Sequence, residues 1–334
     1  MHAAALSAQP GPWSPLRNRL FRAVWIATLV SNVGTWMNDV GSGWLMTSLA
    51  SSPAIVALVS TASTLPIMLL ALPAGAIADI FDRRRLLMGV QVYYTCVIGA
   101  LAVLTLFELV TPWMLLGFSF AVGAGTALAL PAFAAITPQL VGPAELPAAV
   151  ALNSIGINIS RAIGPAIGGL VVAAAGPWLV FALDAISSIG VLIVLLRWRS
   201  VPRQSTLPAE RFLGAIRVGL RFIAHTRPLQ SVLIRGAAFF IFASATWALF
   251  PLVVRQELQR GPEVYGLLLT CIGVGAVSGA ILLPRLGNKA TRSVLVAGAS
   301  MLYALAAVML AHVHNLALLI VAMLATGVAW IAIL

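Results

Sequence analysis

The sequence predicts an all-α polytopic membrane protein, and three observations lead to this class. Of the 334 residues, 61% are hydrophobic and only 9% are charged, whereas soluble domains carry about 25% charged residues. The apolar residues gather into runs of about twenty, the length that crosses the hydrocarbon core of a bilayer. The basic residues fall almost entirely between alternate runs. A soluble enzyme fold and a disordered chain are therefore excluded.

Ten runs are long and apolar enough to be predicted as membrane spans. Six precede the only sizeable polar interruption of the chain and four follow it. The predicted spans are residues 21–47, 54–78, 86–107, 112–136, 147–174, 178–196, 232–254, 264–283, 294–311 and 316–334.

The net charge of +11 is explained by topology. Lys and Arg concentrate on the cytoplasmic side of membrane proteins. Here they precede the first span, follow the second, fill the interruption after the sixth and follow the eighth, whereas the opposite loops hold only Arg255 and Arg260. We therefore expect a cytoplasmic N-terminus, and the charge requires no nucleic-acid partner. The basic residues of the cytoplasmic side are Arg17, Arg19, Arg22, Arg83, Arg84, Arg85, Arg197, Arg199, Arg203, Arg211, Arg217, Arg221, Arg227, Arg235, Arg285, Lys289 and Arg292.

This map divides the chain into four parts. Residues 1–20 are a short cytoplasmic tail, residues 21–196 a six-helix bundle, residues 197–230 a cytoplasmic linker, and residues 231–334 an incomplete C-terminal bundle of four helices. In the linker, apolar residues recur at helical spacing, which predicts a helix lying on the membrane surface; a target for a calmodulin-like protein is the alternative. These apolar residues are Phe212, Ile216, Leu220 and Ile223.

The two halves align as a weak parallel repeat when the second is moved back by about 205 residues, a plan known in secondary transporters. The shift sets the basic turn at residues 285–289 over that at 80–84, and Gly327 near Gly123. On this alignment the chain ends near the counterpart of Leu130. We therefore expect a truncated product or partial sequence with 6 + 4 of 6 + 6 spans.

The turn after the second span carries the most specific motif. It reads Gly75-Ala-Ile-Ala-Asp-Ile-Phe-Asp-Arg-Arg-Arg-Leu-Leu87, and it resembles the signature turn of the major facilitator superfamily, G-x-L-A-D-R-x-G-R-[RK]-x-x-L. Ile77 replaces a Leu, Ile80 an Arg and Asp82 a Gly. The matching positions are Gly75, Ala78, Asp79, Arg83, Arg84 and Leu87.

The glycine and the aspartate of this motif each have a physical explanation. Gly75 would let another helix approach closely, and Asp79 could offer its carboxylate to a helix N-terminus and to Arg83. The resemblance implies a latch that closes the cytoplasmic side, with the eleventh helix as its partner. A turn whose arginines only follow the charge rule is the alternative, but it leaves the glycine and the aspartate unexplained.

A second motif lies on the fifth span. Gly164-Pro165-Ala-Ile-Gly168-Gly169 resembles the GPxxGG element of exporters in the same superfamily. Small residues at positions 156, 160, 164 and 168 form one stripe that permits close packing, and Pro165 removes a backbone donor. A small-residue seam without bearing on transport direction is the alternative. The runs Gly34-Thr-Trp-Met-Asn-Asp39 and Trp44-Leu-Met-Thr47, together with Leu65-Pro66, look like the branch of the superfamily that contains enterobactin-type exporters, and this resemblance extends over essentially the whole chain.

Ionisable residues inside the spans are candidates for function, because a buried charge is costly unless it faces a cavity or a partner. Asp39 shares a helix face with Asn32, Arg161 shares one with Asn158, and Asp184 lies in the sixth span. Our hypothesis is that Asp39 and Arg161 face a central cavity and that Asp39 takes up and releases a proton. Alternatively, the two residues fix helix positions as partners, or Asp39 is hydrated near the outer end of its helix.

Aromatic residues could also line such a cavity, or they could simply pack against helices. The residues considered are Trp36, Trp44, Trp247 and Phe250. No nucleotide-binding loop occurs in the sequence. Cys96 and Cys271 lie inside apolar runs, and His312 and His314 have no companion ligand, so we expect neither cofactor nor metal.

Together these features predict a monomeric secondary active transporter of the bacterial inner membrane and no enzyme. Its expected activity is proton-coupled efflux of a small amphiphilic molecule, siderophore or drug-like, by alternating access. A passive channel, or a transport-inactive protein that serves as a partner subunit, is the alternative.

Overall fold

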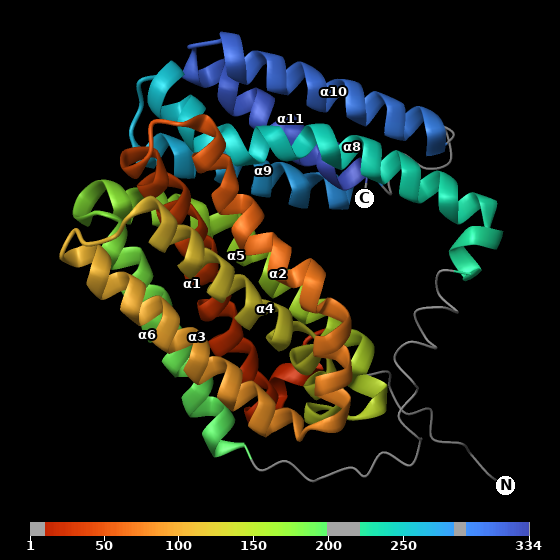
Figure 1. Ribbon diagram of the computed structural model, residues 1–334. Coiled ribbons are helices and arrows are strands. Elements are labelled where there is room, and N and C mark those ends of the chain that lie inside the picture. The colour runs from red at the N-terminus through yellow and green to blue at the C-terminus, as the bar shows by residue number, and fades with distance from the viewer. Residues whose placement is uncertain (1–10, 199–220, 284–291, 334) are drawn as a thin grey trace, which may run out of the picture.

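The computed structural model describes residues 11–198, 221–283 and 292–333, and this part of the chain is built of helices. The described residues form ten long helices, one for each predicted span, and Figure 1 shows how they are arranged. They are α1 (Arg19–Leu49), α2 (Pro53–Ile80), α3 (Arg83–Leu106), α4 (Pro112–Leu140), α5 (Leu146–Ala175), α6 (Pro177–Arg197), α8 (Arg227–Leu252), α9 (Pro262–Leu282), α10 (Arg292–His312) and α11 (Leu316–Ile333). The predicted all-α membrane fold is confirmed.

Nine of the described helical segments are long and apolar enough to cross a membrane; α1 is the long helix that falls outside this set. The reason lies in its polar residues, with Arg19 and Arg22 in the first turn and Asn32, Asn38 and Asp39 farther along. These side chains need not face lipid, because α1 packs against α5 and α6.

The helix ends follow from local sequence. The carboxamide oxygen of Asn18 accepts from the backbone nitrogens of Leu20 (2.9 Å) and Phe21 (3.3 Å), so it caps the start of α1. Proline at the first helical position begins several of the other helices, where its missing N–H costs nothing. Gly176, with φ of +88°, makes the tight turn between α5 and α6.

The two groups of helices repeat one packing relation. In the first group α2 packs on α4, and in the second α9 packs on α11. Each contact involves a glycine of the fourth helix of its group: Gly123 faces the backbone carbonyl of Ser63, and Gly327 faces that of Ile272. A side chain at either glycine would meet backbone, so the contact needs the smallest residue. The repeat alignment predicts that Gly123 and Gly327 occupy corresponding positions, as they do here.

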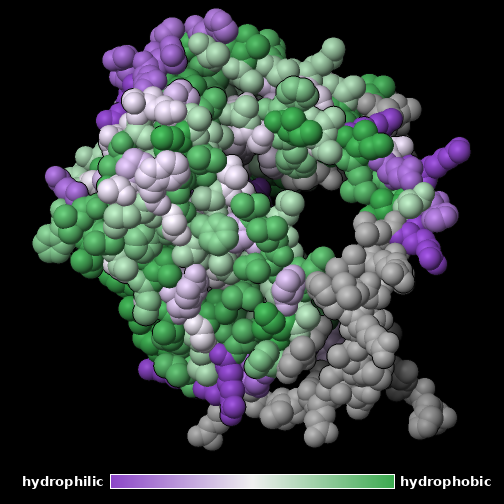
Figure 2. All heavy atoms as spheres, viewed as in Figure 1, coloured by the Kyte–Doolittle hydropathy of each residue, from purple (hydrophilic) through white to green (hydrophobic). Residues whose placement is uncertain are grey.

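The helix groups α1–α6 and α8–α11 lie together at one end and diverge at the other (Figure 1). We call the first end the closed end; it carries the C-terminus of α1 and the segment between α8 and α9. The open end carries the N-termini of α1, α3 and α8. Figure 2 shows the hollow between the groups and hydrophobic residues over much of the surface, with hydrophilic residues gathered at its margins.

Several predicted features lie outside the described residues. They are residues 1–10 of the tail, Phe212, Ile216 and Leu220 of the linker pattern, and the second basic turn at residues 285–289. Ile223 lies in a short described helical stretch. The division of the chain into a tail, two bundles and a linker stays our interpretation.

Candidate functional site

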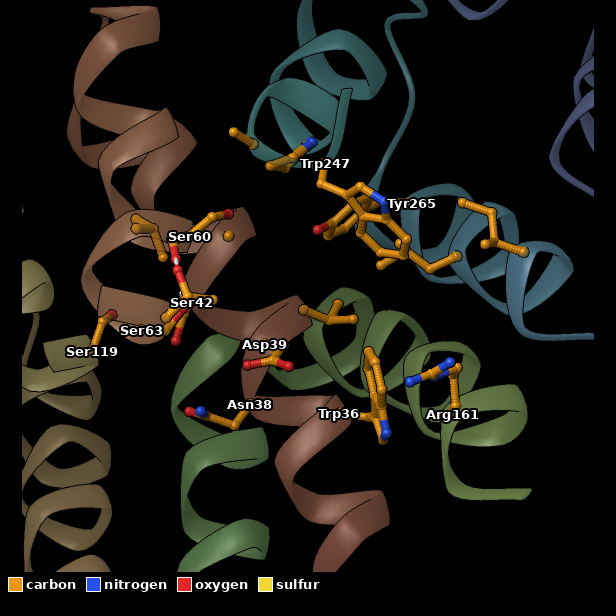
Figure 3. A pocket seen from close by; sticks show the side chains of 18 of the residues that line it. Trp36, Asn38, Asp39, Ser42, Ser60, Ser63, Ser119, Arg161, Trp247 and Tyr265 are labelled. Atoms are coloured by element: carbon orange, nitrogen blue, oxygen red, sulfur yellow. Dashed lines mark hydrogen bonds between the residues drawn. The ribbon is translucent and has the colours of Figure 1, made fainter. Parts of the chain in front are cut away.

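A cavity of about 350 Å³ lies between the two helix groups, and seven helices line it: α1, α2, α4, α5, α8, α9 and α11 (Figure 3). The described residues that line it are mostly apolar and include one acidic and one basic side chain. Polar and aromatic side chains lie on different parts of the wall. The labelled lining residues are Trp36, Asn38, Asp39, Ser42, Ser60, Ser63, Ser119, Arg161, Trp247 and Tyr265.

The acid is Asp39 on α1. Its side chain is exposed, and the space that it meets is this cavity rather than the lipid-facing surface. Its neighbour Asn38 is buried, and the Oδ1 atom of Asn38 has no hydrogen-bond partner in the described part of the chain. A buried acceptor without a partner is costly unless a ligand, water or proton donor fills its place.

The base is Arg161 on α5. Its guanidinium carbon lies 5.3 Å from the ring centroid of Trp36, a cation–π contact that joins α5 to α1. Its Nε is buried without a hydrogen-bond partner. Among the described residues no ion pair connects Arg161 to Asp39, so the two charges face one cavity without neutralising each other.

Hydroxyl groups form the wall on the other side of Asp39. Ser42 comes from α1, Ser60 and Ser63 from α2, and Ser119 from α4, and the Oγ of Ser119 is buried without a partner. Sequence reasoning missed these serines. The only signal was the polar stripe on α2, where positions 60, 63 and 64 recur at helical spacing.

Of the four aromatic residues considered, Trp36 and Trp247 line the cavity. Phe250 is buried in the core and packs edge-on against Tyr265, with ring centroids 5.5 Å apart. Trp44 stacks on Tyr265, with ring centroids 6.3 Å apart. The guanidinium carbon of Arg255 lies 5.5 Å from the ring centroid of Trp44, a cation–π contact.

A polar contact at the closed end accompanies that stack. Arg255, in the π-helical turn Val253–Glu257 after α8, donates from Nη1 to Thr47 Oγ1 of α1 at 2.9 Å. Together with the Trp44 contact, this bond ties the first helix group to the second. Irregular turns of this kind are frequent at functional sites.

The remaining intramembrane candidates lie elsewhere. Asn32 lines a second cavity, so the structure does not bring it to Asp39. Asn158 donates to the backbone oxygen of Ser154, one turn earlier on its own helix, at 2.8 Å. Asp184 is fully buried between helices and accepts from the hydroxyl of Tyr94 at 3.0 Å. A Cβ at Gly34 would lie 2.7 Å from Asp184 Oδ1, so α1 passes directly over this carboxyl group.

The glycines of the fifth-span motif face two different helices. A Cβ at Gly164 would lie 2.6 Å from Cβ of Trp36, and one at Gly168 would lie 3.0 Å from Cα of Met37, both on α1. A Cβ at Gly169 would lie 3.0 Å from Cα of Gly266 on α9. The motif therefore lets α5 contact α1 and α9 at close range, beside the cavity.

The basic turn at the open end makes its bonds within the first helix group. Arg83 donates to the backbone oxygen of Ala135 at 3.2 Å. Arg84 donates to the backbone oxygens of Leu195 and Leu196, both at 2.8 Å, at the C-terminus of α6. Cations are favourable there because these carbonyls have no partner within the helix. Ala78 and Leu87 are buried in the core beneath the turn.

Among the described residues no atom lies within 4 Å of a Cβ built at Gly75, so the close approach expected there stays a prediction. Asp82, which departs from the motif, has a clear role: its Oδ1 accepts from the backbone nitrogen of Arg85 at 2.8 Å and caps α3. The side chain of Asp79 lies outside the described part of the structure.

The family described as transmembrane secretion effector matches residues 10–334, nearly the whole chain. The chain belongs to this family. Transmembrane secretion effectors are a branch of the major facilitator superfamily, so the predicted resemblance is confirmed. The family and the fold are those of transporters, not of enzymes.

Curated relatives agree with this family. The chain is 26% identical to the staphyloferrin A transporter of Staphylococcus aureus over 76% of its own length and 64% of that protein. It is 23% identical to macrolide efflux protein A of Streptococcus pyogenes (83% and 69%) and 27% identical to the enterobactin exporter EntS of Shigella boydii (82% and 65%). The matches thus span about two thirds of each relative.

Solved structures of transporters share the fold. A bacterial homologue of the lysosomal transporter Spinster, inward-facing and unoccupied, has a TM-score of 0.66 at 16% identity, covering 96% of this chain and 74% of its own. A point mutant of the nucleoside transporter NupG has a TM-score of 0.73 at 13% identity, covering 93% and 80%.

Proposed function

We propose that this chain forms the substrate pathway of a secondary carrier that exports a small amphiphilic molecule in exchange for protons. One observation carries the proposal: a cavity between the two helix groups holds an acid and a base that form no ion pair with each other among the described residues, and the described helices of the two groups meet at one end. Alternating access needs such a site, open to one side of the membrane at a time.

Asp39 is the proposed coupling residue. It is the acid among the described residues that line this cavity. A carboxyl group in a largely apolar cavity can be neutral with a proton or negative without one, and these two states favour different occupants. Release of the proton would leave a charge that a cationic or hydrogen-bonding substrate stabilises, whereas proton binding would displace that substrate.

The wall chemistry suggests the class of cargo. Serine hydroxyls face one side of the cavity and tryptophan rings another, which suits a molecule with one hydrogen-bonding part and one flat apolar part. Two of the relatives are named for the siderophores staphyloferrin A and enterobactin, and the third is named for macrolides. We therefore expect a siderophore or a drug-like compound.

The proposed setting is the inner membrane of a bacterium, with the N-terminus in the cytoplasm and the protein acting as a monomer. The basic residues Arg19, Arg83, Arg84, Arg85 and Arg227 lie at the open end, so by the charge rule this conformation faces inward.

The two motifs would then act at opposite ends. The open-end latch consists of Gly75, Ala78, Asp79, Arg83, Arg84 and Leu87, and it would close the cytoplasmic side when the groups approach. The closed-end contact includes Gly164, Pro165, Gly168 and Gly169, and it would hold the outer side shut in the present conformation.

Transport into inverted vesicles tests the coupling. With an imposed proton gradient, we expect erythromycin or a catecholate siderophore to accumulate in vesicles that contain the protein. Asp39→Asn should abolish gradient-driven accumulation and leave counterflow at equal pH measurable. The matched control is Glu108→Gln, in the exposed turn after α3, which should transport normally. Accumulation by Asp39→Asn at the normal rate would refute the coupling role.

A further inference from the structure

A second cavity, of about 540 Å³, lies among the helices of the first group, and all its lining residues belong to α1, α3, α4, α5 and α6. Its lining on α1 runs from Phe21 to Asn32, whereas the first cavity begins at Trp36. Asn32 and Asp39 are about 10 Å apart along the helix. The second cavity therefore lies nearer the open end than Asp39 does.

The second cavity differs from the first in its chemistry. No charged side chain is among the described residues that line it. Three carboxamides and four hydroxyls supply both donors and acceptors, between apolar and aromatic side chains. The polar residues are Thr28, Ser31, Asn32, Gln91, Thr137, Asn153 and Ser154.

Part of this hydrogen-bonding capacity is unused or fixed in place. The Oγ1 atom of Thr28 is buried without a partner. The amide nitrogen of Asn153 donates to Thr137 Oγ1 at 3.1 Å, which orients its carboxamide oxygen. The indole of Trp25 is anchored by a 2.9 Å bond from Nε1 to the backbone oxygen of Leu152. An oriented amide beside an anchored ring is a built environment for a ligand rather than a gap between helices.

We propose that this second cavity is a loading site that binds an uncharged aromatic amide or ester group of the cargo before its charged part reaches Asp39 and Arg161. Carboxamides pair with amides and esters because they offer a donor and an acceptor side by side. The absence of charge among the described lining residues favours a neutral group, since an ion would leave water without compensation there. The loading role rests on the proposed export function, but the binding itself does not.

Equilibrium dialysis of the purified protein tests the site with two radiolabelled probes. 4-Acetamidophenol is a neutral aromatic amide, and 4-acetamidobenzoate is its anionic analogue. We expect the neutral probe to bind more tightly than the anion. Asn153→Leu should weaken its binding about tenfold through the loss of oriented hydrogen bonds, and the near-isosteric Thr28→Val should weaken it several-fold.

Two control variants locate the binding. Asn158→Leu, on the same helix as Asn153, removes a carboxamide that bonds its own helix backbone and lies outside both cavities, so it should leave the affinity unchanged. Asp39→Asn should also leave the affinity for the neutral probe unchanged, even if it abolishes transport. Thermal unfolding of each variant shows whether it has folded.

The outcomes separate the two proposals. Loss of affinity in folded Thr28→Val and Asn153→Leu alone supports the loading site, whatever the transport assays show. Equal affinity in all variants would overturn it, as would an affinity that falls only in Asp39→Asn, which would assign the probe to the first cavity.

Discussion

The two ends of the molecule are built from opposite kinds of contact. At the closed end, bonds and close packing cross between the helix groups: Gly169 lies against Gly266, and Arg255 bonds Thr47. At the open end, the bonds of Arg83 and Arg84 remain within the first group. Among the described residues, the bonds of these two arginines at the open end thus stay within the first helix group, whereas at the closed end bonds and close packing join the two groups.

Under the proposed alternating access, this difference indicates where the conformational change acts. A transition that opens the closed end would have to break the glycine contact and the Arg255 bond, whereas the bonds of Arg83 and Arg84 at the open end could stay in place. Variants at the closed end should therefore affect the position of the groups more than variants at the open end.

The largest expected effect comes from the glycine contact. In Gly266→Ala, the new methyl would lie 2.9 Å from Cα of Gly169, so α5 and α9 must separate. We expect a loss of about 1–3 kcal/mol in stability from this overpacking, measured by thermal unfolding. The control Gly99→Ala has nothing within 4 Å of its new Cβ among the described residues, so it should not destabilise the protein. Equal losses of stability in the two variants would show that the contact between Gly169 and Gly266 does not cause the effect.

The next largest effect is expected at Arg255, which bonds Thr47 at the closed end. Arg255→Gln removes both the bond to Thr47 and the contact over Trp44, each worth about 1 kcal/mol. We expect the outward-open population to rise severalfold, measured as external labelling of a cysteine in the cavity. Arg260→Gln, an exposed basic residue of the same segment, serves as the control. No rise, or an equal rise in both variants, would mean that Arg255 does not hold this end.

A smaller effect is expected at the open end. Arg84→Gln loses two bonds to the C-terminal carbonyls of α6, which should cost about 1 kcal/mol of stability. External labelling of the cavity should not rise, because the closed-end contacts are unchanged and the loss of a proposed latch residue disfavours the outward-open conformation. A rise in labelling as large as that of Arg255→Gln would contradict the distinction between the two ends.

The smallest effect on stability belongs to Gly75→Ala, because the added methyl meets open space here. If the groups close over this face during transport, the same variant should slow the transport rate while its unfolding temperature stays within error. Normal transport in Gly75→Ala would remove this residue from the proposed latch.

Sequence was sufficient for the helices and for two of their contacts. Runs of about twenty apolar residues fix the spans, and the small residues at positions 164 and 168 do pack against α1. The periodicity of a single helix says which residues share a face, but not which neighbour that face meets. For this reason Asn32 was grouped with Asp39 although they line different cavities.

The full lining of the cavity could not be predicted from the sequence, because several helices contribute to it. Ser60, Ser63 and Ser119 come from α2 and α4, and no spacing along one segment connects them. Asp39 and Asp184 are equally unusual residues in apolar runs, yet one faces a cavity and the other is buried under Tyr94 and Gly34. The relative rotation and position of the helices decide such differences.

The central claim is that the cavity around Asp39 opens toward the basic, cytoplasmic end while its outer end is closed. It is tested by a single cysteine, Ser60→Cys, in the cavity wall, with Cys96 and Cys271 replaced by serine and alanine. A membrane-impermeant maleimide is applied to inverted and to right-side-out vesicles. The account predicts rapid labelling from the cytoplasmic face and slow labelling from outside. Faster labelling from outside would contradict it.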